Sequence, residues 1–168
     1  MPCACKKPVE KYPENITWGP LAWRILHGLA EHSGKQSNIN LQTDERRMWH
    51  SMLKGMEPIL PCDVCRTHYK LWIRANPVDT ITSMPYETLN TWVRTWILNL
   101  HNDVNTRTQK EPFVFENLKD VYSRIPITPS WKQLEAIMNL VITLNGVSLI
   151  PWRKWLASVR SLQGLYGI

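Results

Sequence analysis

The sequence has no apolar stretch long enough to cross a membrane. Its most apolar segment, 136–150, is too short for a transmembrane helix and contains two asparagines. The first residues, MPCACKKPVEKYPEN, lack the apolar centre of a secretory signal peptide. We therefore expect a soluble intracellular protein of the cytoplasm, without a membrane span.

Strand alternation and internal repeats are also absent. Apolar residues recur instead at steps of three and four, the spacing of amphipathic helices. Thr17 and Ser83 are expected to cap the first and the fourth helix. The helical segments lie at about 17–29, 43–56, 62–75, 83–100, 115–122, 131–145 and 151–163. The predicted fold is all-α, a four-helix bundle with a short fifth helix and a C-terminal helical extension.

This pattern divides the chain into three parts. We expect a flexible N-terminal arm at 1–12, a helical domain at 13–125 and the extension at 126–168. An apolar stripe in the extension, which includes Trp152 and Leu162, has three interpretations: packing on the bundle, a dimer interface, or a docking surface for a partner.

No run of basic residues occurs, although 20 Lys and Arg against 14 Asp and Glu give a net charge of +6. The basic residues form only scattered pairs, and binding by phosphate neutralisation usually needs a clustered patch. Nucleic acid is therefore not expected as a partner. Phenylalanine is scarce, whereas nine tryptophans predict a Trp-rich core or a flat ligand stacked among rings.

Only four cysteines are present, and Cys62 and Cys65 form a Cys-x-x-Cys motif at a predicted helix start. The positive end of a helix stabilises a thiolate, the reactive species in disulfide exchange. Zinc is the alternative, and its four ligands would come from these two residues, Cys3, Cys5 and His68. The sequence has no second Cys-x-x-Cys and no His-x-x-x-His that would support a zinc site. A thioredoxin-like fold is not expected either, because it would need βαβ units and this chain has a helical pattern. A helical redox protein with an electron acceptor and no metal is the favoured interpretation; a zinc-stabilised basic binding module is its rival.

The other two cysteines, Cys3 and Cys5, are separated by one residue in the N-terminal arm. A disulfide between them would close a small, strained ring, and strained exposed disulfides are oxidising. The pair could carry oxidising equivalents from Cys62 and Cys65 to a substrate. The alternative is two unstructured surface thiols.

Two clusters of side chains could hold a flat, polar ligand. Gly19, Trp23 and His27 lie on one line of the first helix, where a ligand could approach the backbone and stack on the indole. The alternative is an ordinary core Trp and a satisfied helix His.

The second cluster lies at the end of the fourth helix. His101, Asn102 and Asn105 occupy positions where a core helix would continue its apolar face, and Lys110 follows. Polar groups directed inward need partners, which an adenine–ribose–phosphate ligand would supply. The alternative is a polar, frayed helix end.

Together these motifs resemble the Erv/ALR family of sulfhydryl oxidases. The motifs, in order, are Trp18-Gly-Pro-x-x-Trp23-x-x-Leu26-His27, Pro61-Cys-x-x-Cys65 and His101-Asn-x-Val-Asn105 followed by Lys110. The resemblance covers about 16–113 and is greatest to the compact enzymes of large cytoplasmic DNA viruses. Thr108 and Glu111 depart from the family pattern, no cysteines remain for its structural disulfide, and 126–168 has no counterpart in it.

The resemblance implies a thiol oxidase that holds FAD non-covalently, is usually a homodimer, and passes electrons to O2 to give H2O2. It implies that Cys65 lies against the isoalloxazine, that Cys62 exchanges with incoming disulfides, and that Cys3 and Cys5 act as a shuttle. The substrates would be protein dithiols, with a thioredoxin-like carrier as one candidate, in the host cytoplasm or at a viral assembly site. The residues assigned to FAD are Trp18, Gly19, Trp23, His27, Tyr69, His101, Asn102, Val104, Asn105 and Lys110.

Overall fold

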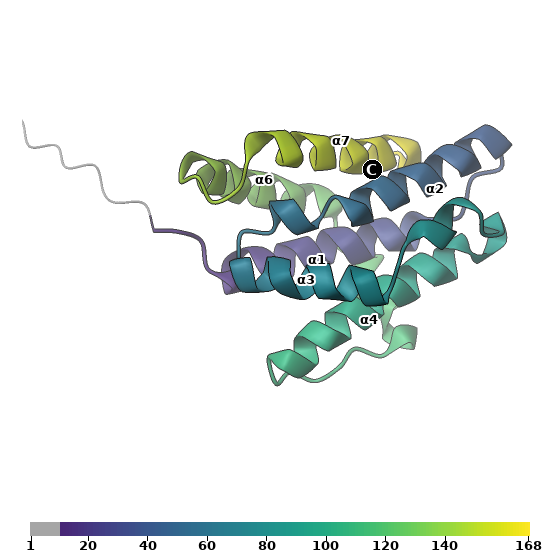
Figure 1. The fold of residues 1–168 in the computed structure, drawn as a ribbon. Coiled ribbons are helices and arrows are strands. Elements are labelled where there is room, and N and C mark those ends of the chain that lie inside the picture. The colour runs from purple at the N-terminus through teal and green to yellow at the C-terminus, as the bar shows by residue number, and fades with distance from the viewer. Residues whose placement is uncertain (1–10) are drawn as a thin grey trace, which may run out of the picture.

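A computed structural model describes residues 11–168 and contains only helices joined by turns and loops (Figure 1). Within this range no strand occurs, and the predicted all-α fold is confirmed. Cys3 and Cys5 lie outside the described residues. The α-helices are α1 (Asn15–His32), α2 (Ile39–Lys54), α3 (Asp63–Ala75), α4 (Leu89–Arg107), α5 (Leu118–Tyr122), α6 (Ile127–Thr143) and α7 (Leu149–Tyr166).

Several helix starts differ from the sequence prediction; α6, for example, begins at Ile127, four residues before the expected Trp131. Helix α1 begins at Asn15, so Thr17 lies inside it and does not cap it. Helix α2 begins four residues before Thr43, because the Asn38 side chain accepts a hydrogen bond from a backbone N–H of the first turn. Ser83 follows a short 3-10 turn, η2 (Asp79–Thr82), and α4 starts only at Leu89.

The C-terminal extension is part of the main core. Helix α6 packs along α1, and α7 packs along α2 (Figure 1). The indole N–H of Trp155 donates to the Met52 carbonyl at 3.1 Å, which joins α7 to α2. The rings of Trp152 and Trp155 stack with centroids 5.5 Å apart, and Trp131 stacks on Trp152. Much of the tryptophan content therefore serves this core.

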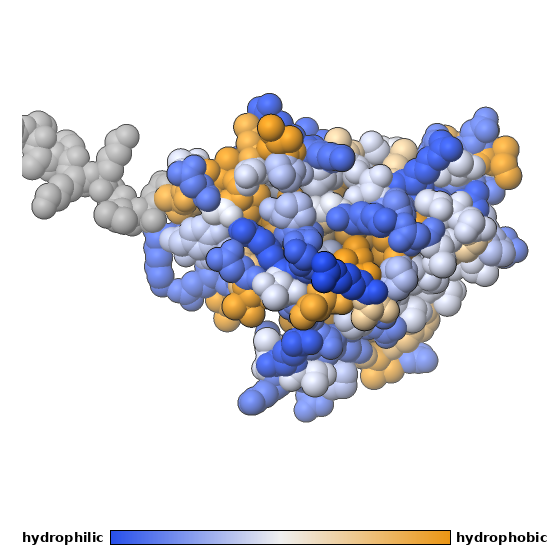
Figure 2. Space-filling model, in the orientation of Figure 1, coloured by the Kyte–Doolittle hydropathy of each residue, from blue (hydrophilic) through white to orange (hydrophobic). Residues whose placement is uncertain are grey.

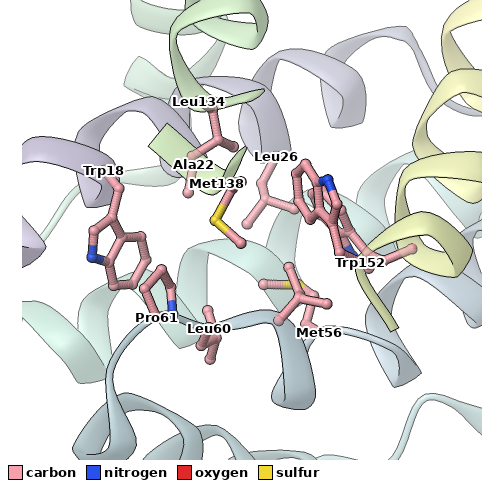
Figure 3. A pocket seen from close by; sticks show the side chains of 11 residues that line it. Trp18, Ala22, Leu26, Met56, Leu60, Pro61, Leu134, Met138 and Trp152 are labelled. Atoms are coloured by element: carbon pink, nitrogen blue, oxygen red, sulfur yellow. The ribbon is translucent and has the colours of Figure 1, made fainter. Parts of the chain in front are cut away.

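An apolar cavity of about 30 Å³ lies between α1, the segment around η1 (Glu57–Ile59), α6 and α7 (Figure 3). Trp18, Ala22 and Leu26 of α1 line it together with Pro61 and Trp152. Ligand pockets in proteins are at least ten times larger. The cavity is therefore a packing void, and it shows that one edge of α1 faces the extension.

The carboxylate of Glu45, in the middle of α2, is fully buried. It accepts hydrogen bonds from the Gly34 backbone N–H at 2.9 Å, from the Tyr166 hydroxyl at 2.6 Å and from the Tyr86 hydroxyl. A buried carboxylate needs such partners, because desolvation without them is costly. This network fixes the last turn of α7 to α2 and to the segment after α1.

No helix among residues 11–168 combines the length and the apolar character that a membrane span requires. The face in view in Figure 2 is largely hydrophilic, and its apolar residues form small, scattered groups.

Candidate redox site

Cys62 and Cys65 lie at the N-terminus of α3, and both are half-buried thiols. Cys62 is the N-cap residue, and its Sγ accepts a hydrogen bond from the Cys65 backbone N–H at 3.2 Å. A sulfur in this position faces the unpaired N–H groups and the positive end of the helix dipole. The Cys-x-x-Cys motif therefore lies at a helix start, as expected from the sequence.

The start of α1 lies directly against this pair. The side-chain amide nitrogen of Asn15 is 3.6 Å from Cys62 Sγ and 3.5 Å from Cys65 Sγ. Just before it, the Tyr12 hydroxyl donates to the carbonyl of Pro61 at 2.7 Å. Neither residue was predicted, because their role depends on how α1 meets α3 and no local motif marks it.

The two thiols differ in acidity. Burial alone would raise the pKa of Cys62, but hydrogen bonds from Cys65 and from the Asn15 amide outweigh burial and lower this pKa below its usual range. Burial, followed by the neighbouring Cys62, raises the pKa of Cys65 to about 12. Of the two thiols, Cys62 is therefore the one that ionises more readily, while Cys65 keeps its proton to higher pH.

The turn between α6 and α7 also reaches the redox pair. Arg66, one turn into α3, donates to the Leu60 carbonyl at 2.6 Å and to the carbonyl of Gly146. A Cβ at Gly146 would lie 2.2 Å from the Tyr12 hydroxyl, so only glycine allows this contact without rearrangement. The extension thus supports the loop that leads into Cys62.

Beside the stripe of α1 that lines the cavity, aromatic rings from α1, α4 and α5 form a cluster. Trp23 stacks on His101 with ring centroids 4.1 Å apart, and His27 stacks on Tyr122 at 4.4 Å. Phe113 completes the cluster, 5.1 Å from His101. The structure thus brings Trp23, His27 and His101, all assigned to FAD by the resemblance, into one cluster; Phe113 and Tyr122 carried no sequence signal for this contact.

The two histidines of this cluster are both neutral. His27 Nε2 and His101 Nδ1 are 3.0 Å apart, so one ring donates and the other accepts. Burial, the neighbouring His101 and Arg94 lower the pKa of His27 to about 3. Burial and then Lys110 lower the pKa of His101 to about 4. Uncharged imidazoles offer a donor or an acceptor to a ligand without adding charge.

The polar end of α4 holds the loop that follows it. The Asn102 side chain donates to the carbonyl of Phe113 at 2.9 Å and accepts from its N–H at 2.8 Å. The Asn105 side chain donates to the Glu111 carbonyl at 3.2 Å, while Lys110 itself is exposed. These side chains have partners within the chain, and their contact with a cofactor stays a prediction.

The remaining residues assigned to FAD have different surroundings. Trp18 lines the small apolar cavity described above, and Val104 is half-buried. Tyr69 is buried, and its hydroxyl donates to the Leu53 carbonyl at 2.6 Å. Gly19 is open, because a Cβ there would meet nothing within 4 Å.

These features fit a flat, polar-edged group such as FAD. Trp23, whose ring stacks on His101, lies one helical turn after the open backbone at Gly19. An open groove of about 550 Å³ has the volume of a ligand site, but it lies on α4 around Trp92 and Trp96. None of the residues assigned to FAD lines it.

A metal site is not formed by residues 11–168: no group of three or more His, Cys, Asp or Glu is arranged to hold an ion there. His68, one of the further ligands considered for the zinc alternative, is paired with Asp103 of α4. Arg107 binds the same carboxylate at 2.8 Å, and it is the main cause of the lowered pKa of Asp103. His68 therefore serves to join α3 to α4.

Comparison with known proteins gave consistent matches. The profile of the Erv1/Alr family matches residues 21–123. Two FAD-linked sulfhydryl oxidases from isolates of African swine fever virus are 29% and 28% identical over 109 residues, which is 65% of this chain and 82% of each relative. A protein of Frog virus 3 is 26% identical over 108 residues, or 62% of this chain and 65% of that protein. No solved structure matches the chain significantly.

Proposed function

The chain belongs to the Erv1/Alr family, and on that premise we propose that Cys62 and Cys65 are the redox pair of an FAD-linked sulfhydryl oxidase. The observation that carries the assignment is the pair itself: two thiols at the start of α3, with a lowered pKa on Cys62 and a raised one on Cys65. The relatives support a thiol oxidase that uses FAD.

Disulfide exchange at this pair would run in two steps. A substrate thiolate attacks Cys62 Sγ of the oxidised pair, the Cys62–Cys65 bond breaks, and a substrate–Cys62 disulfide forms while Cys65 leaves as a thiolate with the electron pair. The second substrate thiolate then attacks the substrate sulfur of that bond and releases Cys62. The substrate gains a disulfide, and the pair holds two electrons. Cys62 is the better final leaving group, because thiols of lower pKa leave faster.

FAD would be held by the ring cluster and the polar end of α4, and when bound it supplies a two-electron acceptor for the pair and a route to O2, with H2O2 as product. Trp23 and His101 would supply stacking faces, and His27 an uncharged hydrogen-bonding edge. The open backbone at Gly19 would admit the group, with Asn102, Asn105 and Lys110 at its polar end.

The test is replacement of Cys65 by serine in the full chain. Cys65→Ser should keep the yellow flavin spectrum of the purified protein and lose oxidation of dithiothreitol by at least about a hundredfold, because the internal disulfide cannot form. Replacement of Ser161, an exposed α7 residue, by alanine is the matched control and should change neither. Retained oxidation in Cys65→Ser would refute the assignment.

The partners are protein dithiols and O2, and we include in the proposal a thioredoxin-like carrier and a homodimer. Because α6 and α7 cover α1 and α2, a homodimer would associate through another surface.

A further inference from the structure

Among the described residues, Asn15 is the side chain outside the Cys-x-x-Cys motif that has hydrogen-bond contacts to both sulfurs. Its amide nitrogen lies at nearly the same distance from Cys62 Sγ, 3.6 Å, and from Cys65 Sγ, 3.5 Å. These distances fall within the range of N–H to sulfur hydrogen bonds. An amide has two N–H donors, so it could serve either sulfur or both.

The ordinary reason for an asparagine at this place is helix capping, and the structure does not support it. Asn15 is the first residue of α1, whereas the N-cap is Glu14, and no side-chain cap bond is formed there. An asparagine that caps uses its side-chain oxygen on a backbone N–H. Here the side chain instead directs its nitrogen at the sulfurs of another helix.

We propose that Asn15 is a positioning residue that donates a hydrogen bond to whichever sulfur of the Cys62–Cys65 pair becomes anionic. The inference rests on the assignment of these cysteines as the redox pair. Exchange creates two thiolates in turn: Cys65 departs when the substrate sulfur bonds to Cys62, and Cys62 departs when the substrate disulfide closes. Because the amide nitrogen lies within reach of both sulfurs, it can stabilise each departing thiolate from the same position.

The same donor favours the reduced pair, because a disulfide carries no charge for the amide to stabilise. Without Asn15 the thiolates would be less stable, and the pair would be harder to reduce. The tether at Tyr12, three residues earlier, holds this part of the chain to Pro61 at 2.7 Å and so keeps the amide beside the pair.

The experiment uses the full chain with Cys3→Ser and Cys5→Ser, so that Cys62 and Cys65 are the only thiols that can be alkylated. The pH dependence of iodoacetamide alkylation gives the pKa of the reactive thiol. Asn15→Leu removes the donor at similar volume and should raise this pKa by roughly half a unit to one unit, with three- to tenfold slower alkylation at a pH below it. Dithiothreitol should also reduce the pair more slowly, by a similar factor, in an experiment without air that monitors the bleaching of the flavin absorbance.

A second variant separates this role from a structural one. Asn15→Asp introduces a carboxylate that is favourable in the first turn of a helix, so it should keep or raise the stability of α1. Beside the sulfurs, however, it should raise the thiol pKa more than leucine does. Asn15→Gln, which retains an amide, should recover part of the wild-type value.

Asn40→Leu is the matched control, because Asn40 is exposed in the first turn of α2 and its side chain makes no hydrogen bond among the described residues. It should leave the thiol pKa unchanged. An unaltered thiol pKa in Asn15→Leu and Asn15→Asp, in a protein that still oxidises dithiols, would overturn the role of Asn15 and leave the redox assignment intact. An equal shift in Asn40→Leu would also overturn it.

Discussion

His27 and His101 are held without charge in the ring cluster between α1 and α4. Both have folded-state pKa values far below the ordinary 6.5, at about 3 and about 4. The unfolded chain therefore takes up protons first as the pH falls, and the folded state loses stability from about pH 6.5 downwards. At and above pH 7 both rings are neutral in either state, and the contribution is fully present.

The unfolding free energy of the protein should thus drop by about 2 to 4 kcal/mol between pH 7 and pH 5 from this pair. His101→Asn should remove about half of that drop, and urea-induced unfolding at the two pH values measures it. His50→Asn, a change at the surface of α2, is the control and should leave the drop in place. Identical pH dependence in His101→Asn and wild type would contradict the charge state assigned to the cluster.

The sequence predicted the part of this cluster that lies along helices. Trp23 and His27 are one turn apart on α1, so helical spacing alone places them on one face. Phe113 comes from a loop, and Asn15 acts across two helix starts, so neither position has a local pattern. Their contacts depend on tertiary packing, which a single sequence does not contain.

At the scale of elements, α1 contributes both to the packing of the C-terminal extension and to the aromatic ring cluster. One stripe faces the extension through the small cavity, and the neighbouring stripe carries Trp23 and His27 toward α4 and α5. All seven α-helices were predicted from apolar spacing, whereas the starts of α1, α2, α4 and α6 were misplaced. The cap residues were the weak point, because Thr17 and Ser83 are chemically suitable caps that the folded chain does not use.

Helix α7 should contribute to stability as a core element. Leu162 is 0% exposed, whereas Leu149, on the same helix, is 42% exposed. Leu162→Ala should lower the unfolding free energy by about 2 to 4 kcal/mol through lost burial and a cavity, and Leu149→Ala by less than about 1 kcal/mol. Urea unfolding of both variants at pH 7 checks this, and equal values would show that α7 does not pack as described.

At the scale of the whole molecule, the described chain begins beside the redox pair. Tyr12 is bonded to the carbonyl of Pro61, the residue before Cys62, and Cys5 precedes Tyr12 by seven residues. A chain of that length spans at most about 24 Å. The predicted shuttle pair is thus joined by a short chain to a residue bonded beside Cys62, and a tether of this kind raises the effective concentration of the groups that it links.

Cys3→Ser should accordingly slow the oxidation of a reduced protein substrate several-fold and change oxidation of dithiothreitol little, because a small dithiol reaches Cys62 directly. Oxygen consumption with each substrate measures the two rates. Lys6→Ser, in the same segment, controls for changes in local charge. If Cys3→Ser slowed both substrates equally or neither, the shuttle would be excluded.

The extension shows where prediction from the sequence ended. Its helical pattern indicated α6 and α7, and packing on the bundle was one of three interpretations. The structure selects packing, because Trp152 and Trp155 are buried against α1 and α2. Amphipathic spacing identifies an apolar face but does not say which surface covers it.

Because α1 contacts both the extension and the ring cluster, few changes in its length can be tolerated. One inserted residue would turn every later side chain of the helix by about 100°, and both the cavity edge at Leu26 and the ring contact at His27 would be lost together. A substitution on one edge can be compensated by its neighbours, but a change of length cannot. Among related sequences, α1 should therefore vary in composition while alignment gaps fall elsewhere, for example in the loop between Thr108 and Phe113.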